Sequence, residues 1–207
     1  MTTLTPLFST AVDYARSAHA AQYRKGTSIP YLYHLLGVAS LVLEYGGNED
    51  QAIAGLLHDV LEDCGATHEQ PIGEKFGEAV LKIVKDCTDG TLEGKADALT
   101  GGTAIDHWRR RKLTYLAHLE HVDASSLLVS GSDKLHNARA ILGDLDDSRV
   151  GSAVFERFTA GREGTLRYYQ SLSEILSRRQ APMASAFENT IVRMHYLAHA
   201  DVRVALE

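Results

Sequence analysis

The sequence predicts an all-α protein, a bundle of about 8–10 helices. Helical spacing of apolar residues runs along most of the 207-residue chain. By contrast, no segment shows the convincing alternation of apolar and polar residues that marks a half-buried strand. The third predicted helix shows the helical spacing most clearly. Its apolar residues recur at i, i+3, i+4, i+7 and i+8, and they are Ile53, Leu56, Leu57, Val60 and Leu61.

The helices are predicted, in order, over residues 10–23, 31–45, 50–63, 67–76, 80–85, 104–120, 123–143, 152–177 and 183–204. Ser9 or Thr10 is expected to cap the first helix and Thr67 the fourth, because short hydroxyl side chains accept hydrogen bonds from the N–H groups at a helix start. The pair Gly46-Gly47 ends the second helix. Residues 88–103 are rich in glycine and predict a long loop.

Length, charge and cysteine content narrow the possible classes of protein. A chain of 207 residues is long enough for one domain, which we expect to span residues 1–207. The net charge of −6 argues against a general affinity for nucleic acids, and no run of about 18 apolar residues predicts a membrane-spanning helix. Cys64 and Cys87 form no CxxC pair, and the first residues lack the pattern of a signal peptide. We therefore expect a cytoplasmic protein without nucleic-acid or membrane partners.

The adjacent pair His58-Asp59 carries the most chemical information. Imidazole nitrogens and carboxylate oxygens both bind divalent transition metals. At ~100° per residue, this pair and the acids Glu62 and Asp63 fall on the side of the third helix opposite its apolar stripe. Most polar helix faces are simply solvated. This helix alone is therefore compatible with a metal site and with an ordinary solvated face.

Two residues far away in the sequence could complete a metal site. His34 lies among large apolar residues, and Asp133 lies in a segment predicted to be a buried helix. A buried aspartate needs a partner, because an unpaired charge is costly to bury. That partner is a metal ion, a set of backbone donors, or a cation such as Lys134 or Arg139 in a structural ion pair. A lone histidine in such surroundings is more often a hydrogen-bonded residue of the core than a metal ligand.

Several short motifs follow one another along the chain. They are Arg24-Lys25-Gly26…Pro30-Tyr31…His34, Leu56-Leu57-His58-Asp59-Val60-Leu61-Glu62-Asp63, Phe76-Gly77…Val80…Val84…Thr88-Asp89-Gly90, Trp108-Arg109-Arg110-Arg111-Lys112…Tyr115…His118-Leu119 and Asp133-Lys134-Leu135-His136-Asn137-Ala138-Arg139. Through them the chain resembles the HD-domain superfamily of metal-dependent phosphohydrolases, and more closely the hydrolase domain of the Rel/Spo alarmone enzymes. The resemblance covers roughly residues 8–175. The bifunctional relatives continue into synthetase and regulatory domains, so a chain of 207 residues is most similar to the hydrolase-only members.

The resemblance implies a fold and a metal site. The fold is an HD-domain-type helical bundle. The metal, usually manganese in this family, is held by two histidines and two aspartates, and here these are His34, His58, Asp59 and Asp133. Leu35 stands where relatives often have a proline, with no consequence for the ligands.

The resemblance also implies roles in catalysis and substrate binding. Glu62 and Asp63 are expected to orient or deprotonate the attacking water. Arg24 and Lys25 are expected to contact the nucleotide, and Asn137 to line its site. Taken without the motif, Arg24 and Lys25 are an ordinary solvated pair of loop charges.

The reaction that the resemblance implies is hydrolysis of (p)ppGpp, a guanosine nucleotide with a pyrophosphate on its ribose 3′-oxygen. The products are pyrophosphate and GDP or GTP, and the enzyme class is a metal-dependent guanosine-3′,5′-bis(diphosphate) 3′-pyrophosphohydrolase. The alternatives are another HD phosphohydrolase, such as a 5′-nucleotidase or a deoxynucleotide triphosphohydrolase; a preference for the adenosine alarmone (p)ppApp; and a metal-free sensor or interaction module. The sequence does not select the metal, the base or the oligomeric state.

Overall fold

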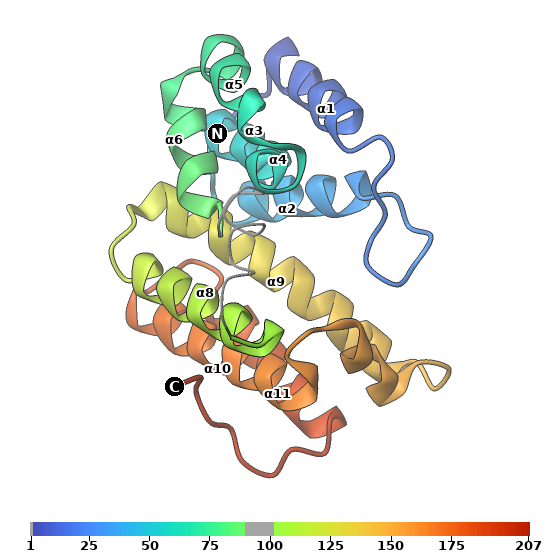
Figure 1. Cartoon of the computed structure of the whole chain (residues 1–207). Coiled ribbons are helices and arrows are strands. Elements are labelled where there is room, and N and C mark those ends of the chain that lie inside the picture. The colour runs from blue at the N-terminus through green and yellow to red at the C-terminus, as the bar shows by residue number, and fades with distance from the viewer. Residues whose placement is uncertain (1, 90–101) are drawn as a thin grey trace. The chain divides into compact units, whose positions relative to one another are not determined.

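The structure, a computed structural model, describes residues 2–89 and 102–207. These residues confirm the all-α prediction, since they form helices and no β-strand, with an isolated β-bridge between Tyr23 and Pro30 (Figure 1). Most of the loop predicted over 88–103, including Gly90, lies outside the described residues. The chain divides into two compact units, residues 1–99 with 122–133 and residues 100–121 with 134–207. A single domain over residues 1–207 stays a prediction.

The first unit is built around α3 (Glu49–Leu57). Its other elements are α1 (Pro6–Ala18), α2 (Leu32–Glu44), α4 (Val60–Cys64), the 3₁₀-helix η1 (Ala66–His68), α5 (Glu69–Phe76), α6 (Glu78–Cys87) and the start of α9 (Ala124–Asp146). Helix α3 packs against α1, α2 and α6, and every residue from Ala52 to His58 is buried. A helix that is enclosed on all sides has no solvated face. The segment that the sequence predicts as amphipathic is therefore the core of this unit.

Helices α2 and α3 approach closely at Gly55. A Cβ atom at this position would lie 3.3 Å from the Cα atom of Ala39, which is tighter than most side chains tolerate. Leu35 on α2 and Ile53 and Leu56 on α3 are fully buried. The contact bears on the site, because α2 carries His34 and α3 leads into His58.

The first helix begins and ends earlier than predicted. It starts at Pro6, and the Oγ1 atom of Thr5 accepts a hydrogen bond of 3.2 Å from a backbone N–H in the first turn. The prediction of Ser9 or Thr10 as the cap is wrong, because proline has a fixed φ that suits the first helical position. The helix ends at Ala18, not at residue 23.

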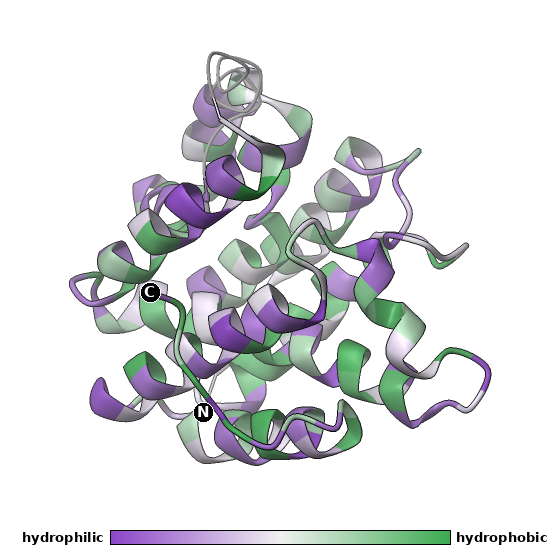
Figure 2. Cartoon of the chain, turned by 60° about the horizontal axis from the view of Figure 1, so that its bottom comes forward, coloured by the Kyte–Doolittle hydropathy of each residue, from purple (hydrophilic) through white to green (hydrophobic). Residues whose placement is uncertain are grey.

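The second unit contains α8 (Ala104–Leu119), the remainder of α9, the 3₁₀-helix η2 (Gly151–Arg157), α10 (Gly161–Arg178) and α11 (Ala184–Leu197). Helix α10 packs against α8, α11 and η2. Tyr168, Leu172 and Phe187 are among the buried side chains of this unit. Figure 2 shows hydrophobic and hydrophilic residues alternating along individual helices, as expected of helices with one buried face.

Other helix boundaries differ from the prediction for local reasons. Thr67 lies inside η1 and does not cap α5, which begins at Glu69 without a side-chain cap. The helix predicted over 152–177 is divided into η2 and α10, because Phe158 adopts an extended conformation between them. The helix predicted over 183–204 ends at Leu197, and His199 follows with a left-handed φ of 52°. The helices predicted over 31–45, 80–85, 104–120 and 123–143 are confirmed as α2, α6, α8 and α9, with shifted ends.

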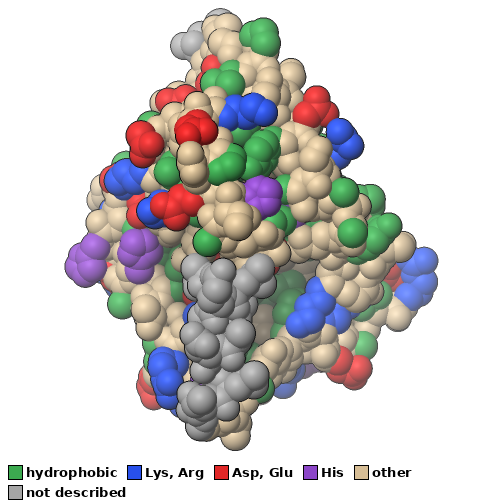
Figure 3. Space-filling view, turned by 45° about the horizontal axis from the view of Figure 1, so that its top comes forward, with side chains coloured by type: hydrophobic (Ala, Val, Ile, Leu, Met, Phe, Trp, Pro, Cys, Tyr) green, Lys and Arg blue, Asp and Glu red, His purple; other side chains and the backbone are tan. Residues whose placement is uncertain are grey.

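Charged side chains of both signs are interspersed on the face drawn in Figure 3. Among the described residues, no helix combines the length and the apolar composition needed to cross a lipid bilayer.

Candidate metal centre

The His58-Asp59 pair lies at a break between two helices. Helix α3 ends at Leu57, and Asp59, with φ −94° and ψ −3°, precedes the first residue of α4. The prediction of one continuous helix over 50–63 is therefore wrong. The break leaves His58 in the buried core, with 1% of its surface exposed, while the Asp59 side chain keeps 17% exposure.

A backbone hydrogen bond fixes the orientation of the His58 ring. Its Nδ1 atom lies 2.9 Å from the carbonyl oxygen of Gly55, one turn earlier on α3. A carbonyl oxygen can only accept a hydrogen bond, so Nδ1 carries the proton. In the neutral ring, Nε2 then presents a lone pair. This is the tautomer in which Nε2 can bind a metal.

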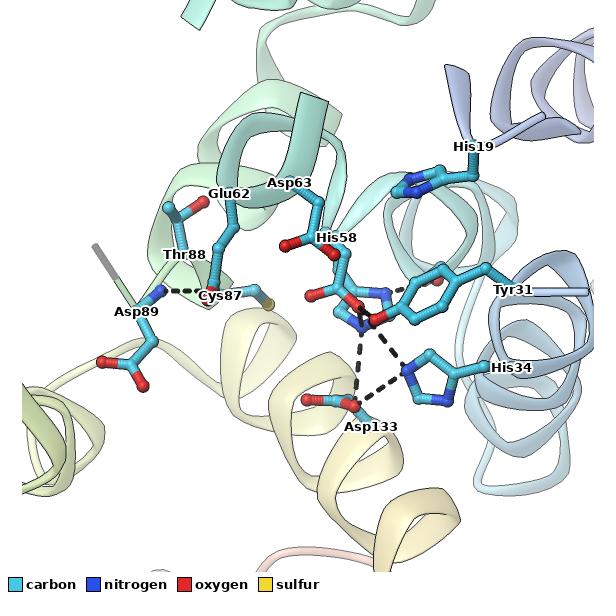
Figure 4. A network of polar contacts seen from close by, with 12 residues as sticks. His19, Tyr31, His34, His58, Glu62, Asp63, Cys87, Thr88, Asp89 and Asp133 are labelled. Carbon is cyan, nitrogen blue, oxygen red and sulfur yellow. Dashed lines mark hydrogen bonds and ion pairs between the residues drawn. The ribbon is translucent and has the colours of Figure 1, made fainter. Parts of the chain in front are cut away.

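The structure brings the four residues of the predicted ligand set together. The Nε2 atom of His34 lies 3.2 Å from Oδ1 of Asp133 and 3.6 Å from Oδ2 of Asp59. The Nε2 atom of His58 lies 3.0 Å from Oδ2 of Asp59 and 3.5 Å from Oδ1 of Asp133. One ligand atom each from His34, His58 and Asp59 lie within 4.8 Å of one another. Figure 4 shows the side chains of His34, His58 and Asp133 converging on one point.

Burial makes this cluster electrostatically demanding. His34 is fully buried, and 5% of the Asp133 side chain is exposed. Burial alone lowers the pKa of His58, but the carboxylates of Asp59 and Asp133 outweigh it and raise that pKa well above the usual range. Burial alone raises the pKa of Asp59, but the charge of His58 and the closeness of both imidazoles bring it well below its usual range. Two carboxylates in this setting call for positive charge, and a divalent cation supplies it.

The chemistry of the donor set fits a divalent transition metal. Two imidazole nitrogens and two carboxylate oxygens form a mixed nitrogen and oxygen set of intermediate softness. The cluster is therefore a candidate divalent-metal site. The roles of His34, His58, Asp59 and Asp133 as ligands stay a prediction.

The two acids expected to act on water lie one turn beyond Asp59. The N–H of Asp63 donates to the carbonyl oxygen of Asp59 at 2.9 Å, which closes this turn. The Oε2 atom of Glu62 accepts a hydrogen bond of 3.2 Å from the backbone N–H of Asp89. The Oδ2 atom of Asp63 accepts one of 2.7 Å from Nε2 of Gln22. Both carboxylates are half-buried and held by donors.

The loop that carries Arg24 and Lys25 is a short turn linked to the cluster by an aromatic ring. The N–H of Arg24 donates to the carbonyl oxygen of Ile29 at 2.8 Å, and Gly26 between them has a φ of 73°, which side chains rarely adopt. The guanidinium carbon of Arg24 lies 5.6 Å from the centre of the Tyr31 ring, within the range of a cation–π interaction. Lys25 is exposed.

Tyr31 is a site residue to which the sequence gives no role. Its hydroxyl donates a hydrogen bond of 2.6 Å to Oδ2 of Asp59. Burial and the nearby charge of Asp59 raise the pKa of Tyr31, so the hydroxyl stays a donor. Tyr31 stands in the motif Pro30-Tyr31…His34, three residues before His34, and this one-turn spacing is its signal in the sequence. Gln22 and Asp89 hold the two acids. Asp89 stands in the motif Thr88-Asp89-Gly90, but the sequence indicates this contact for neither residue.

Asn137 lies on α9 in the second unit. Its predicted role in lining the nucleotide site stays a prediction.

An all-α fold with a buried cluster of histidine and aspartate defines a class, that of helical domains with a candidate divalent-metal site. The comparison with protein families gives the particular member of this class. Residues 11–166 match the family described as HD domain, and the chain belongs to this family. Dependence on a divalent metal is implied by this membership.

Curated relatives are about a third identical to this chain over the segment that aligns. A guanosine-3′,5′-bis(diphosphate) 3′-pyrophosphohydrolase of Aquifex aeolicus (strain VF5) is 37% identical over 132 residues, which are 63% of this chain and 17% of the relative. The guanosine-3′,5′-bis(diphosphate) 3′-pyrophosphohydrolase MESH1 of Xenopus tropicalis is 35% identical over 132 residues, 62% of this chain and 66% of the relative. The match thus spans less than two thirds of either relative.

Solved structures share the fold. A metazoan ortholog of SpoT, described as hydrolysing ppGpp, has a TM-score of 0.58 at 22% identity, with 86% of this chain and 98% of that chain covered. A protein of Listeria monocytogenes EGD-e has a TM-score of 0.63 at 22% identity, with 84% and 98% covered. At this identity the likeness concerns the fold.

Proposed function

We propose that this chain hydrolyses the 3′-pyrophosphate of (p)ppGpp-type alarmone nucleotides and releases pyrophosphate and GDP or GTP. The names of the relatives from Aquifex aeolicus and Xenopus tropicalis, 37% and 35% identical, support this substrate class. The observation that carries the proposal is the buried histidine and aspartate cluster with two acids one turn further on. Its members are His34, His58, Asp59, Asp133, Glu62 and Asp63.

The proposed metal is Mn²⁺, held by His34, His58, Asp59 and Asp133. The ring orientation of His58 supports its role as a ligand, because Nδ1 is hydrogen-bonded to a carbonyl oxygen and Nε2 faces the carboxylates. When bound, the divalent metal supplies a Lewis acid that lowers the pKa of water and offsets negative charge on the phosphate.

Glu62 and Asp63 are proposed to orient the attacking water and accept its proton. Each carboxylate is held by a donor from another segment, the Asp89 N–H and the Gln22 amide, so each is oriented before substrate arrives. The water oxygen bonds to the phosphorus next to the ribose 3′-oxygen, and the bond between that phosphorus and the 3′-oxygen breaks. The 3′-oxygen takes up a proton and leaves as a hydroxyl group.

Arg24, Lys25 and Asn137 are proposed to bind the nucleotide. A protein of net charge −6 needs local positive charge for an anionic substrate, and the loop of Arg24 and Lys25 provides it beside Tyr31. The planar guanidinium of Arg24 can grip a phosphate with two hydrogen bonds or stack on a base, whereas Lys25 acts as a point charge.

The proposed setting is the cytoplasm, with a small nucleotide as the ligand and without a nucleic-acid or membrane partner. The chain's two cysteines, Cys64 and Cys87, form no disulfide bond, which supports a reducing compartment.

The test of the function is product identification. Purified protein with Mn²⁺ is incubated with ppGpp, pppGpp, ppApp, GTP, dGTP and a nucleoside 5′-monophosphate, and products are resolved by ion-exchange chromatography. Pyrophosphate and GDP from ppGpp support the proposal. Triphosphate from dGTP, or inorganic phosphate from the monophosphate, would instead assign another HD phosphohydrolase activity. Faster turnover of ppApp would assign the adenosine alarmone.

Metal content tests the ligand set. Asp59→Ala is expected to lose bound metal, measured by elemental analysis after dialysis, because it removes a carboxylate that touches both imidazoles. Equal metal content in the variant and the wild type would reject the site.

A further inference from the structure

We infer that Gln22 is a positioning residue for Asp63, with its amide oriented by His19. The inference rests on the proposed function, because it assigns Asp63 a role at the reacting water. Gln22 lies between α1 and α2, outside both the proposed ligand set and the loop charges.

Hydrogen-bond chemistry fixes the orientation of the Gln22 amide. The Nε2 atom lies 2.7 Å from Oδ2 of Asp63, and an ionised carboxylate only accepts, so Nε2 is the donor. The Oε1 atom lies 2.6 Å from Nδ1 of His19, and an amide oxygen only accepts, so His19 Nδ1 carries the proton. The flipped amide would place two acceptor oxygens against each other at Asp63, so this contact decides the orientation. The three side chains therefore admit one arrangement.

The partners of Gln22 are themselves held in place. His19 is buried, with 4% of its surface exposed, and its ring stacks on Tyr31 with centroids 5.1 Å apart and planes inclined by 24° (Figure 4). The backbone of Gln22 donates to the carbonyl oxygen of His19 at 3.0 Å and accepts from the N–H of Tyr31 at 2.9 Å. A side chain anchored at both its backbone and its amide is pre-organised to hold a carboxylate.

The arrangement connects the acid to the cluster. Tyr31 stacks on His19 and donates to Asp59, while Gln22 accepts from His19 and donates to Asp63. Gln22 thus holds the Asp63 carboxylate and Tyr31 holds the Asp59 carboxylate, and the contacts of His19 with both Gln22 and Tyr31 link the two. We expect this network to determine the rate of the chemical step and to leave substrate affinity and metal content unchanged.

The test compares Gln22→Met with Gln70→Met at saturating Mn²⁺ over a range of ppGpp concentrations. Methionine has nearly the shape of glutamine without its hydrogen-bonding groups. Gln70 is a matched control, because its amide also donates to a carboxylate at 2.7 Å, that of Glu74, on the exposed side of α5. Gln22→Met is expected to lower kcat about tenfold, with KM and bound metal as in the wild type. Gln70→Met is expected to keep the wild-type values.

A second pair of variants separates positioning from a general loss of structure. His19→Phe keeps an aromatic ring beside Tyr31 and removes the donor to Gln22. It is expected to lower kcat, and the double variant with Gln22→Met is expected to be no slower than Gln22→Met alone, because both act through one hydrogen-bonded unit. If Gln22→Met does not fold, Gln22→Glu replaces the donor by an acceptor at equal size and is expected to lower kcat by at least as much.

The outcomes distinguish the inference from the function on which it rests. If the wild type releases pyrophosphate and the folded Gln22 variant turns over like Gln70→Met, the positioning role is rejected and the function stands. Loss of metal from the Gln22 variants, or fully additive losses in the double variant, also rejects it. A wild type that releases no pyrophosphate from ppGpp rejects the proposed function and this inference together.

Discussion

Replacing Tyr31 by phenylalanine removes one oxygen atom and is expected to weaken Mn²⁺ binding. The hydroxyl donates to Oδ2 of Asp59 at 2.6 Å, the same oxygen that lies 3.0 Å from Nε2 of His58. Without this donor, the Asp59 carboxylate loses the contact that holds its orientation in the half-buried space beside the imidazoles. The aromatic ring, and with it the stacking on His19, is retained in the variant.

The size of the effect follows from the type of bond. A hydrogen bond to a charged group contributes about 1.5–3 kcal/mol. At about 1.4 kcal/mol per factor of ten, this corresponds to a loss of roughly 10- to 100-fold in metal affinity. Removal of an outer partner of a metal ligand in other proteins costs about the same.

The affinity is measured by competition between the metal-free protein and a fluorescent Mn²⁺ chelator. Tyr23→Phe is the control, because Tyr23 lies in the same loop and its side chain is 56% exposed. We expect the control to bind like the wild type. If Tyr31→Phe also binds Mn²⁺ like the wild type while Asp59→Ala does not, the hydrogen bond does not support the ligand and the reasoning fails.

Three further predictions follow from single contacts. Glu62→Gln is expected to keep its metal and lose most turnover, since Glu62 is one turn from the proposed ligands; unchanged turnover removes it from the mechanism. Gly47→Ala is expected to lower the free energy of unfolding by about 1–3 kcal/mol in urea titrations, because its Cβ would lie 2.8 Å from a backbone oxygen, whereas Gly143→Ala, with nothing within 4 Å, is expected to raise it by up to about 1 kcal/mol. The hydrogen bond from Lys82 lowers the pKa of Asp123 to about 2, so this exposed pair stabilises the fold above about pH 4 and the contribution is lost as the pH falls toward 2. Asp123→Asn is therefore expected to cost about 0.5 kcal/mol at pH 7 and nothing near pH 2, and a cost independent of pH would contradict the ion pair.

Apolar spacing predicts most helices of this chain but not their ends. The stripe from Ile53 to Leu61 continues at helical spacing through the break at His58 and Asp59, so the sequence shows no interruption there. The break between α3 and α4 depends on the backbone angles at this point and on the packing around the segment. In the same way, the extended conformation of Phe158 divides a predicted helix without changing its pattern.

In the site, too, some residues could be predicted from the sequence and others could not. The ligand set and the acids could be predicted, because histidine, aspartate and glutamate in a known order carry their own chemical signal. The residues that hold these side chains in place could not be predicted. Glutamine and tyrosine occur on many surfaces, and only the fold reveals that Gln22 reaches Asp63, 41 residues away, and that Tyr31 reaches Asp59, 28 residues away.

The brevity of α4 offers a way to follow the ion without a chromophore. The helix has five residues, far below the length at which an isolated helix is stable. Its first turn is closed by the amide of Asp63 on the carbonyl oxygen of Asp59, the residue that we propose as a ligand. An ion that immobilises Asp59 would slow deuterium uptake at the Asp63 amide, whereas amides in the middle of α3 are already shielded. The rate of deuterium uptake at this one amide would then report whether the metal site is occupied.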